Sequence, residues 1–172
     1  MIETRLDKNF KIKGFFDDET STISYVVYDM TSKKCAVIDS VLDFDFSSGT
    51  IDYHNAEKII SFIEKMKLDL EWLIETHVHA DHLSASPYIQ KKLGGKIGIS
   101  EKISDIQNIF GKTFNAGTEF QRDGSQFDRL FKDNDEYKIG SIKCKVINTP
   151  GHTPACTAPV SYTHLTLPTT SP

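Results

Sequence analysis

The feature that most constrains the fold is a buried-strand pattern that runs directly into a cluster of histidines. The stretch "LEWLIETH" (residues 70–77) has the apolar content of a buried strand, and "THVHADH" (residues 76–82) overlaps its end. The cluster consists of the imidazoles of His77, His79 and His82 and the carboxylate of Asp81. Polar groups directly after a buried strand are expected to form a site outside the carboxyl end of a sheet.

The spacing within the cluster suits metal binding. Side chains at i and i+2 of a strand share a face, so His77 and His79 are expected to reach one metal ion together. Asp81 and His82, in the loop that follows, could reach a second point close by, so that one short loop serves two adjacent metals. We therefore predict a metal site here rather than a chance group of surface histidines.

A further imidazole is expected from His152. It lies in "NTPGHTPACT", directly after the strand-like run "SIKCKVINT", where Pro150 and Gly151 can turn the backbone and Pro154 can start a helix. Alone this histidine would be a weak signal. Beside the first cluster it is the natural third imidazole of the same site.

The chain as a whole reads as an α/β arrangement. Short apolar runs predict strands at 10–16, 23–29, 35–40, 70–77 and 96–100. Helical patterns predict helices at 55–67, 84–93 and 101–112, and two strand-like runs joined by a short turn predict a hairpin over 135–149. Both faces of the strand at 23–29 are apolar, so we expect it to be covered on both sides. The acidic stretch 41–54 is expected to be a loop. This order of elements predicts a sheet with layers on its faces.

Composition narrows the function classes. The length of 172 residues and the apolar fraction of 38% fit one soluble globular domain. The net charge of −4, with both signs interspersed, gives no basic stripe, so neither nucleic acid nor a membrane surface is the expected partner. No apolar run approaches the roughly 20 residues of a membrane span, and no signal peptide is recognised, so we expect a cytoplasmic protein.

The cysteines do not suggest a disulfide framework. They are Cys35, Cys144 and Cys156, an odd number without a C-x-x-C pair, which suits a reducing compartment. The first two are expected in the core. Cys156 follows the second histidine motif, so a place near the site and a place in the core are both open.

The C-terminal segment departs from the rest of the chain. From Pro159 it reads "PVSYTHLTLPTTSP", which is crowded with Thr, Ser and Pro and has the composition of a disordered tail. It also resembles the in-frame translation of a transposon-end sequencing adapter. We therefore expect residues 1–158 to form one incomplete domain, truncated at its C-terminus, and residues 159–172 to be a non-native tail.

The motifs resemble a known family. "THVHADH" matches the H-x-H-x-D-H signature of the metallo-β-lactamase superfamily, and "TPGHTPACT" matches its next histidine motif. Within that superfamily, "FFDDETSTISYVVYD", "AVIDSV" and "ETHVHADHLSA" are most similar to the persulfide dioxygenases (sulfur dioxygenases), and the resemblance extends over residues 10–158. It implies an αββα sandwich with a metal site at one edge of the paired sheets.

The resemblance also implies roles for single residues. His77 and His152 match two iron ligands of the dioxygenases, whereas His79, Asp81 and His82 match residues that complete a dinuclear site in the hydrolytic relatives, where Asp81 also counts as catalytic. Asp39, which closes the strand "CAVID", would orient a ligand or the histidine loop; a plain strand-end turn residue is the alternative. After Thr157 the family pattern stops, without its Gly-Asp carboxylate ligand, its glutathione-gripping residues or the further histidine of the hydrolases.

For an intact parent enzyme, the resemblance implies mononuclear Fe(II) held by two histidines and one carboxylate, with open positions for O₂ and a thiol-type substrate. The substrate would be a persulfide such as glutathione persulfide, which is oxidised to sulfite and glutathione in hydrogen sulfide metabolism. The alternative is a hydrolase of the glyoxalase II or lactonase type with one or two Zn(II) ions, which lower the pKa of a bound water. A third hypothesis is an inactive, truncated fragment with exposed apolar surface. A homodimer is an open alternative for the assembly.

Overall fold

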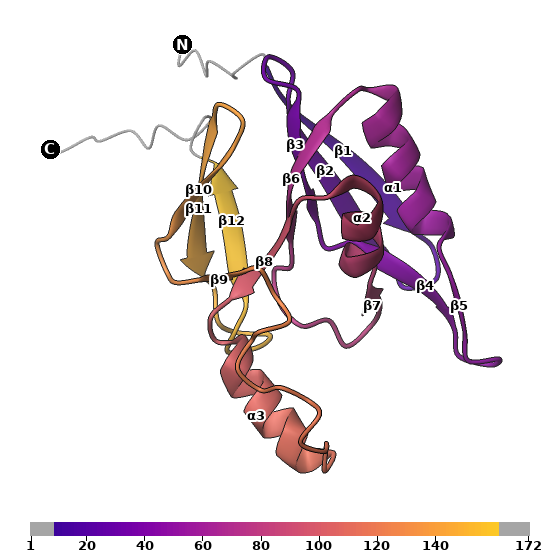
Figure 1. Cartoon of the computed structure of the whole chain (residues 1–172), viewed down its shortest axis with the longest axis vertical. Coiled ribbons are helices and arrows are strands. Elements are labelled where there is room, and N and C mark those ends of the chain that lie inside the picture. Colours follow the sequence, from indigo (N-terminus) through magenta and orange to yellow (C-terminus); the bar gives the residue numbers. More distant parts are fainter. Residues whose placement is uncertain (1–8, 162–172) are drawn as a thin grey trace, which may run out of the picture.

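The computed structural model describes residues 9–161, which form three layers with α3 projecting from one end (Figure 1). The strands are β1 (Phe10–Asp17), β2 (Thr22–Asp29), β3 (Lys34–Ile38), β4 (Val41–Asp45), β5 (Thr50–Asp52), β6 (Asp69–Ile74), β7 (Leu83–Ser84), β8 (Lys96–Ser100), β9 (Arg129–Phe131), β10 (Glu136–Ile139), β11 (Ile142–Asn148) and β12 (Thr157–Ser161). The helices are α1 (His54–Lys65), α2 (Ser86–Leu93) and α3 (Ile103–Thr113). The predicted α/β class is confirmed.

The large sheet has the strand order β1-β2-β3-β6-β8-β9. Its first three strands are antiparallel neighbours, as the short polar connection "MTSKK" predicts for β2 and β3, whereas β3, β6, β8 and β9 run parallel. In the parallel pair β3 and β6, Ile38 lies opposite Ile74. Their carboxyl ends therefore meet at one edge of the sheet, and the residues that follow each strand become neighbours.

Helices α1 and α2 cover one face of this sheet (Figure 1). The apolar side chains of α1 recur at helical spacing, so that Ile59, Ile60 and Ile63 point into the core. They pack against strand residues such as Val37 and Leu73. Burial of a side chain of this size contributes roughly 1.5–3 kcal/mol, so this stripe fixes the helix on the sheet.

The second sheet, β10-β11-β12, packs on the opposite face. Tyr137, Ile139 and Val146 are buried there against Ala36 and Ile74 of the large sheet. The layers are helix, sheet and sheet, which are the first three layers of an αββα sandwich. This agrees with the fold that the sequence motifs imply.

Several expectations about local structure were wrong. The acidic stretch 41–54 is not a loop, because β4 pairs with β5 and with β7, and its carboxylates bond within the turn and to α1. Pro154 lies in a turn rather than at a helix start. Strand β2 is covered on both sides only in its second half, where Val26 and Val27 are buried, since Ile23 and Tyr25 are 41% and 39% exposed. These outcomes depend on tertiary pairing that periodicity does not record.

The end of the described chain also differs from expectation. β12 continues to Ser161 and pairs with β11 along its whole length, beyond the predicted boundary at residue 158. Residues 162–172 lie outside the described residues, and the interpretation of 159–172 as a non-native tail stays a prediction. Among the helices that the structure describes, none is both long enough and apolar enough to cross a lipid bilayer.

Candidate metal centre

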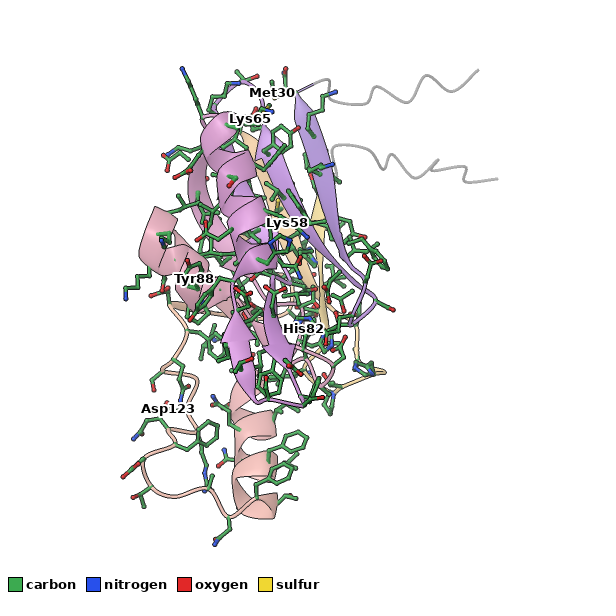
Figure 2. The ribbon with its side chains drawn as sticks, turned by 90° about the vertical axis from the view of Figure 1, so that its right-hand side faces the viewer. Met30, Lys58, Lys65, His82, Tyr88 and Asp123 are labelled. Carbon is green, nitrogen blue, oxygen red and sulfur yellow. The ribbon has the colours of Figure 1, made fainter. Side chains whose placement is uncertain are left out.

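The histidine loop occupies the carboxyl end of the large sheet. β6 ends at Ile74, so the loop 76–82 begins earlier than the predicted strand end at residue 77. His82 lies at the end of the layers opposite Met30 and Lys65 (Figure 2). The ring centroids of His77 and His79 are 4.1 Å apart, as are those of His79 and His82. The predicted cluster is therefore brought together, although by loop folding and not by strand alternation.

Asp39 and Thr76 determine how His77 presents its ring. The Thr76 hydroxyl donates to Asp39 Oδ2 (2.7 Å), and the Thr76 backbone N–H donates to Asp39 Oδ1 (2.7 Å). The same hydroxyl lies 3.0 Å from His77 Nδ1. Because a hydroxyl has one proton and gives it to Asp39, its oxygen accepts from Nδ1–H. The lone pair of His77 is then on Nε2, which is free to bind a metal ion.

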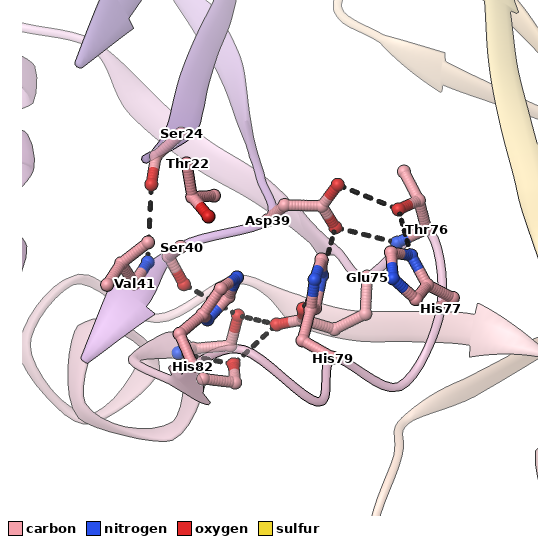
Figure 3. A network of polar contacts seen from close by, with 12 residues as sticks. Thr22, Ser24, Asp39, Ser40, Val41, Glu75, Thr76, His77, His79 and His82 are labelled. Atoms are coloured by element: carbon pink, nitrogen blue, oxygen red, sulfur yellow. Dashed lines mark hydrogen bonds and ion pairs between the residues drawn. The ribbon is translucent and has the colours of Figure 1, made fainter. Parts of the chain in front are cut away.

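The ring of His79 is oriented with its Nε2 toward Asp39 (Figure 3). Its Nε2 lies 3.1 Å from Asp39 Oδ1, and its Nδ1 lies 3.8 Å from Asp81 Oδ1. Burial alone would lower the pKa of His79, but the close contact with Asp39 and the negative charges of Asp39, Glu75 and Asp81 outweigh burial and raise it. Asp39 thus contacts a candidate ligand, and its role in orienting the histidine loop stays a prediction.

His82 and Asp81 provide the other side of the cluster. His82 Nδ1 donates to the Leu83 carbonyl (2.9 Å), which leaves its lone pair on Nε2, a buried atom without a hydrogen-bond partner in the described chain. Asp81 is more exposed, and its Oδ2 accepts from the Thr22 hydroxyl (3.0 Å). Potential ligand atoms of His79, Asp81 and His82 all lie within 4.8 Å of one another. A buried nitrogen lone pair beside a carboxylate is a suitable donor set for a metal ion.

His152 approaches from the second sheet. Its ring centroid lies 5.0 Å from that of His77, with the two planes nearly perpendicular. The approach is fixed by Thr157 at the start of β12, whose backbone N–H (2.9 Å) and hydroxyl (3.1 Å) both donate to the Thr76 carbonyl. Burial lowers the pKa of His77, and the nearby imidazoles of His79 and His152 lower it further. A neutral imidazole is the form that binds metal.

Cys156 is buried in the turn between His152 and β12. Its Sγ accepts from the backbone N–H of Thr153 (3.2 Å) and lies 3.1 Å from the Thr153 hydroxyl. These contacts order the turn that carries His152. Cys35 and Cys144 are buried in the core as expected, and burial raises the pKa of both thiols, to about 12 and about 11.

Two cavities border the histidine loop. One, of about 320 Å³, lies between the loop and β8, with largely apolar walls that include Val78, Ile97, Ile99 and Phe127. The other, of about 190 Å³, lies on the side of β4, where Phe44 and Phe46 meet Asp81. A further cavity of about 670 Å³ has Trp72 and Lys96 in its lining but none of the candidate metal ligands.

The sequence did not identify Glu75 or the residues that hold it. Glu75 is 4% exposed, and its Oε1 accepts from the hydroxyls of Ser84 and Ser86, each at 2.5 Å. Burial raises its pKa to about 7, only partly offset by these two hydrogen bonds. The available signal was a charged residue at the end of an otherwise apolar strand, which is rare unless the charge has a partner.

Comparison with known proteins agrees with this architecture. Residues 18–160 match the metallo-β-lactamase superfamily, and the chain belongs to that superfamily. A solved structure of ETHE1 from Myxococcus xanthus superposes with a TM-score of 0.65 at 22% identity, covering 88% of this chain and 53% of that one. At this identity the structural likeness shows the fold.

Among individual relatives, a probable metallo-hydrolase of Burkholderia pseudomallei is 49% identical over 84% of this chain and 49% of its own length. Glyoxylase B2 of Dictyostelium discoideum is 42% identical over 88% of this chain and 51% of its own. The mitochondrial persulfide dioxygenase ETHE1 of Homo sapiens is 24% identical over 89% of this chain and 48% of its own length. The chain thus spans about half the length of these relatives.

Proposed function

We propose that the chain provides two imidazole ligands, His77 and His152, of a metal centre that oxidises a persulfide with O₂. The observation that carries this proposal is the pair His77 and His152, which face each other with the His77 tautomer fixed through Thr76 and Asp39. Two imidazoles on one side of a site suit a mononuclear Fe(II) centre, which would supply O₂ activation when bound. The likeness to persulfide dioxygenases supports the same chemistry.

In this reaction the persulfide, O₂ and water give the thiol and sulfite, with release of two protons. The terminal sulfur is oxidised, O₂ is reduced, and the sulfur–sulfur bond breaks. The chain would orient the persulfide beside the histidine loop and keep its apolar part in the cavity formed with Ile97, Ile99 and Phe127. Those apolar walls also exclude water from one side of the loop.

A second candidate is metal-dependent hydrolysis of a thioester or ester. The convergence of His79, Asp81 and His82 favours it, because these side chains could hold a second metal ion beside the first. The names of the relatives that are 42% and 49% identical point the same way. Zn(II) is then the expected metal, and Asp81 would act both as ligand and as catalytic residue.

The two candidates predict different stoichiometry and different substrates. The purified chain would be loaded with Fe(II) without oxygen or with Zn(II), and its metal content measured. Oxygen uptake with glutathione persulfide would then be compared with hydrolysis of S-lactoylglutathione. The dioxygenase predicts one iron per chain and oxygen uptake, and hydrolysis without oxygen uptake would refute it. Metal binding without either reaction would favour the inactive-fragment hypothesis.

Single substitutions assign the ligands in the same assays. His77→Ala and His152→Ala are expected to reduce iron content and oxygen uptake to background. His54→Ala is the matched control, because His54 is an exposed histidine at the start of α1 and belongs to neither histidine motif. Retention of iron by both the His77→Ala and the His152→Ala variant would show that the metal is held elsewhere.

A further inference from the structure

Glu75 is a buried carboxylate with one oxygen in use and one available. Its Oε1 is anchored by the hydroxyls of Ser84 and Ser86. Its Oε2 is also buried and has no hydrogen-bond partner among the described residues. Burying a polar atom without a hydrogen-bond partner costs free energy of folding, so the groups that face this oxygen indicate its role.

The group that faces this free oxygen is the imidazole of His79. Glu75 Oε2 lies 3.7 Å from His79 Nε2, and Asp39 Oδ1 lies 3.1 Å from the same nitrogen (Figure 3). His79 Nε2 is likewise buried without a hydrogen-bond partner among the described residues, so these are ion-pair contacts rather than hydrogen bonds. When ionised, both carboxylate oxygens can only accept, and they converge on this one ring nitrogen. This surrounding favours a proton on Nε2 and leaves the lone pair on Nδ1, the side that faces Asp81.

Asp39 shares its two oxygens between His79 and Thr76. Its Oδ1 already accepts from the Thr76 backbone N–H, and its Oδ2 accepts from the Thr76 hydroxyl. Glu75 Oε2 has no such competing donor. Glu75 therefore adds an acceptor that serves His79 alone, and the two serine hydroxyls keep it in place.

We propose that Glu75 is a positioning residue that, with Asp39, holds His79 protonated at Nε2 and so presents Nδ1 to a metal ion next to Asp81 and His82. The metal part of this proposal rests on the second candidate of the proposed function, in which His79, Asp81 and His82 hold a metal ion. A carboxylate that accepts from the distal N–H of a ligating histidine fixes the ring and makes it a stronger ligand. Loss of such a partner typically weakens metal binding by about 10–100-fold.

The test compares Glu75→Gln with Glu64→Gln. Gln has the shape of Glu, but its amide can donate toward His79 Nε2 and would then favour the opposite tautomer. Glu64 is an exposed carboxylate on α1 and gives the same change of charge. We expect affinity for Zn²⁺, measured by competition with a chromophoric chelator, to fall about 10–100-fold in Glu75→Gln and to stay unchanged in Glu64→Gln.

A second measurement needs no metal. Long-range ¹H–¹⁵N correlation spectra of the metal-free protein report which nitrogen of His79 carries the proton. Wild type is expected to show Nε2–H, and Glu75→Gln is expected to shift His79 toward Nδ1–H. Weaker Zn²⁺ binding with an unchanged tautomer would mean a merely structural role and would overturn the proposal, as would unchanged affinity and tautomer together.

The outcomes separate this proposal from the proposed function. If wild type binds no Zn²⁺ or Fe(II), the proposed function fails, while the His79 tautomer still decides the role of Glu75. If Glu75→Gln does not fold, Glu75→Asp is measured in its place, because it keeps the charge but withdraws the carboxylate from the ring. A partial shift toward Nδ1–H in that variant is expected, and an unchanged spectrum would contradict the proposal.

Discussion

The carboxylate of Asp39 accepts two hydrogen bonds from Thr76, one from its backbone N–H and one from its hydroxyl, each at 2.7 Å. The two residues follow β3 and β6, which are parallel neighbours, so this contact ties the carboxyl ends of two strands together. Asp39 reaches it with φ at +50°, in the left-handed region that few residues other than Gly, Asn and Asp adopt. The candidate ligand cluster is built on this link.

Thr76→Val should therefore weaken metal binding without destroying the fold. Valine keeps the shape of threonine but removes the hydroxyl that donates to Asp39 and accepts from His77. We expect Zn²⁺ affinity to fall by about 10-fold or more, and the free energy of unfolding to fall by about 1–3 kcal/mol. Chelator competition and urea unfolding measure the two effects. Thr118→Val, an exposed threonine, is the control, and equal affinity in both variants would contradict the expectation.

Much of the fold was predictable because local pattern and tertiary burial agree. The apolar runs that became β1, β2, β3, β8 and β11 were identified with bounds within a few residues. β4 and β5 were missed because Asp43 and Asp45 give that stretch a loop-like composition, whereas the strands are stabilised by pairing with each other and with β7. Strands as short as β7 and β9 leave no periodicity to detect.

The candidate site was predictable in its membership but not in its geometry. A motif of closely spaced histidines identifies the side chains that meet, and the structure brings all of them together with His152. Which ring nitrogen each histidine presents depends on partners far apart in sequence, such as Asp39 and Thr76. The inward direction of Glu75 depends on Ser84 and Ser86 of the following segment, which strand periodicity does not encode.

A second contact between layers should govern stability in acid. Asp29, at the end of β2, accepts from the backbone N–H (3.0 Å) and hydroxyl (2.6 Å) of Ser141 in the β10–β11 turn. Burial by itself would raise the pKa of Asp29, but hydrogen bonds from Ser141, Ser32 and Thr31 outweigh burial and hold this pKa far below its usual range. The folded state therefore stabilises the ionised carboxylate of Asp29 more than the unfolded state does.

The sign of the pH effect follows from that depressed pKa. The stabilisation is fully present above the unfolded pKa of about 3.9 and is lost as the pH falls toward the lower folded pKa. Asp29→Asn should reduce the free energy of unfolding by about 1–3 kcal/mol at pH 7, with a smaller difference from wild type at pH 3–4. Urea unfolding across this range measures it, with Asp18→Asn on an exposed carboxylate as control. A difference that does not depend on pH would refute the assignment.

The turn that Asp29 holds leaves no room for a side chain at Gly140. Its φ is +58°, and a Cβ there would lie 1.9 Å from Ser32 Oγ and 2.9 Å from Asp29 Oδ2. Gly140→Ala should lower the free energy of unfolding by at least about 1–2 kcal/mol, from the left-handed backbone alone. At Gly117 a Cβ would meet nothing within 4 Å, so Gly117→Ala is the matched control. Equal melting temperatures for the two variants would contradict this prediction.

The exposed apolar face of β1 and β2 should make the isolated chain self-associate. Ile12 and Phe16 are 56% and 55% exposed, and Ile23 and Tyr25 lie opposite Phe16 and Gly14 in the β1–β2 register. Adjacent apolar side chains on one open face of a sheet favour association. The double variant Ile12→Thr, Phe16→Thr should sediment as a monomer at concentrations where wild type forms larger species, and it should bind less of the dye ANS.

Because both side chains are largely in solvent, this double variant should change the free energy of unfolding by no more than about 0.5 kcal/mol per site. Phe110→Thr, Phe114→Thr is the matched control, since those rings are 48% and 73% exposed but lie on and just beyond α3. If association depends on the β1–β2 face, only the first pair restores the monomer. A monomeric wild type, or an equal effect of both pairs, would show that this face is not the contact surface.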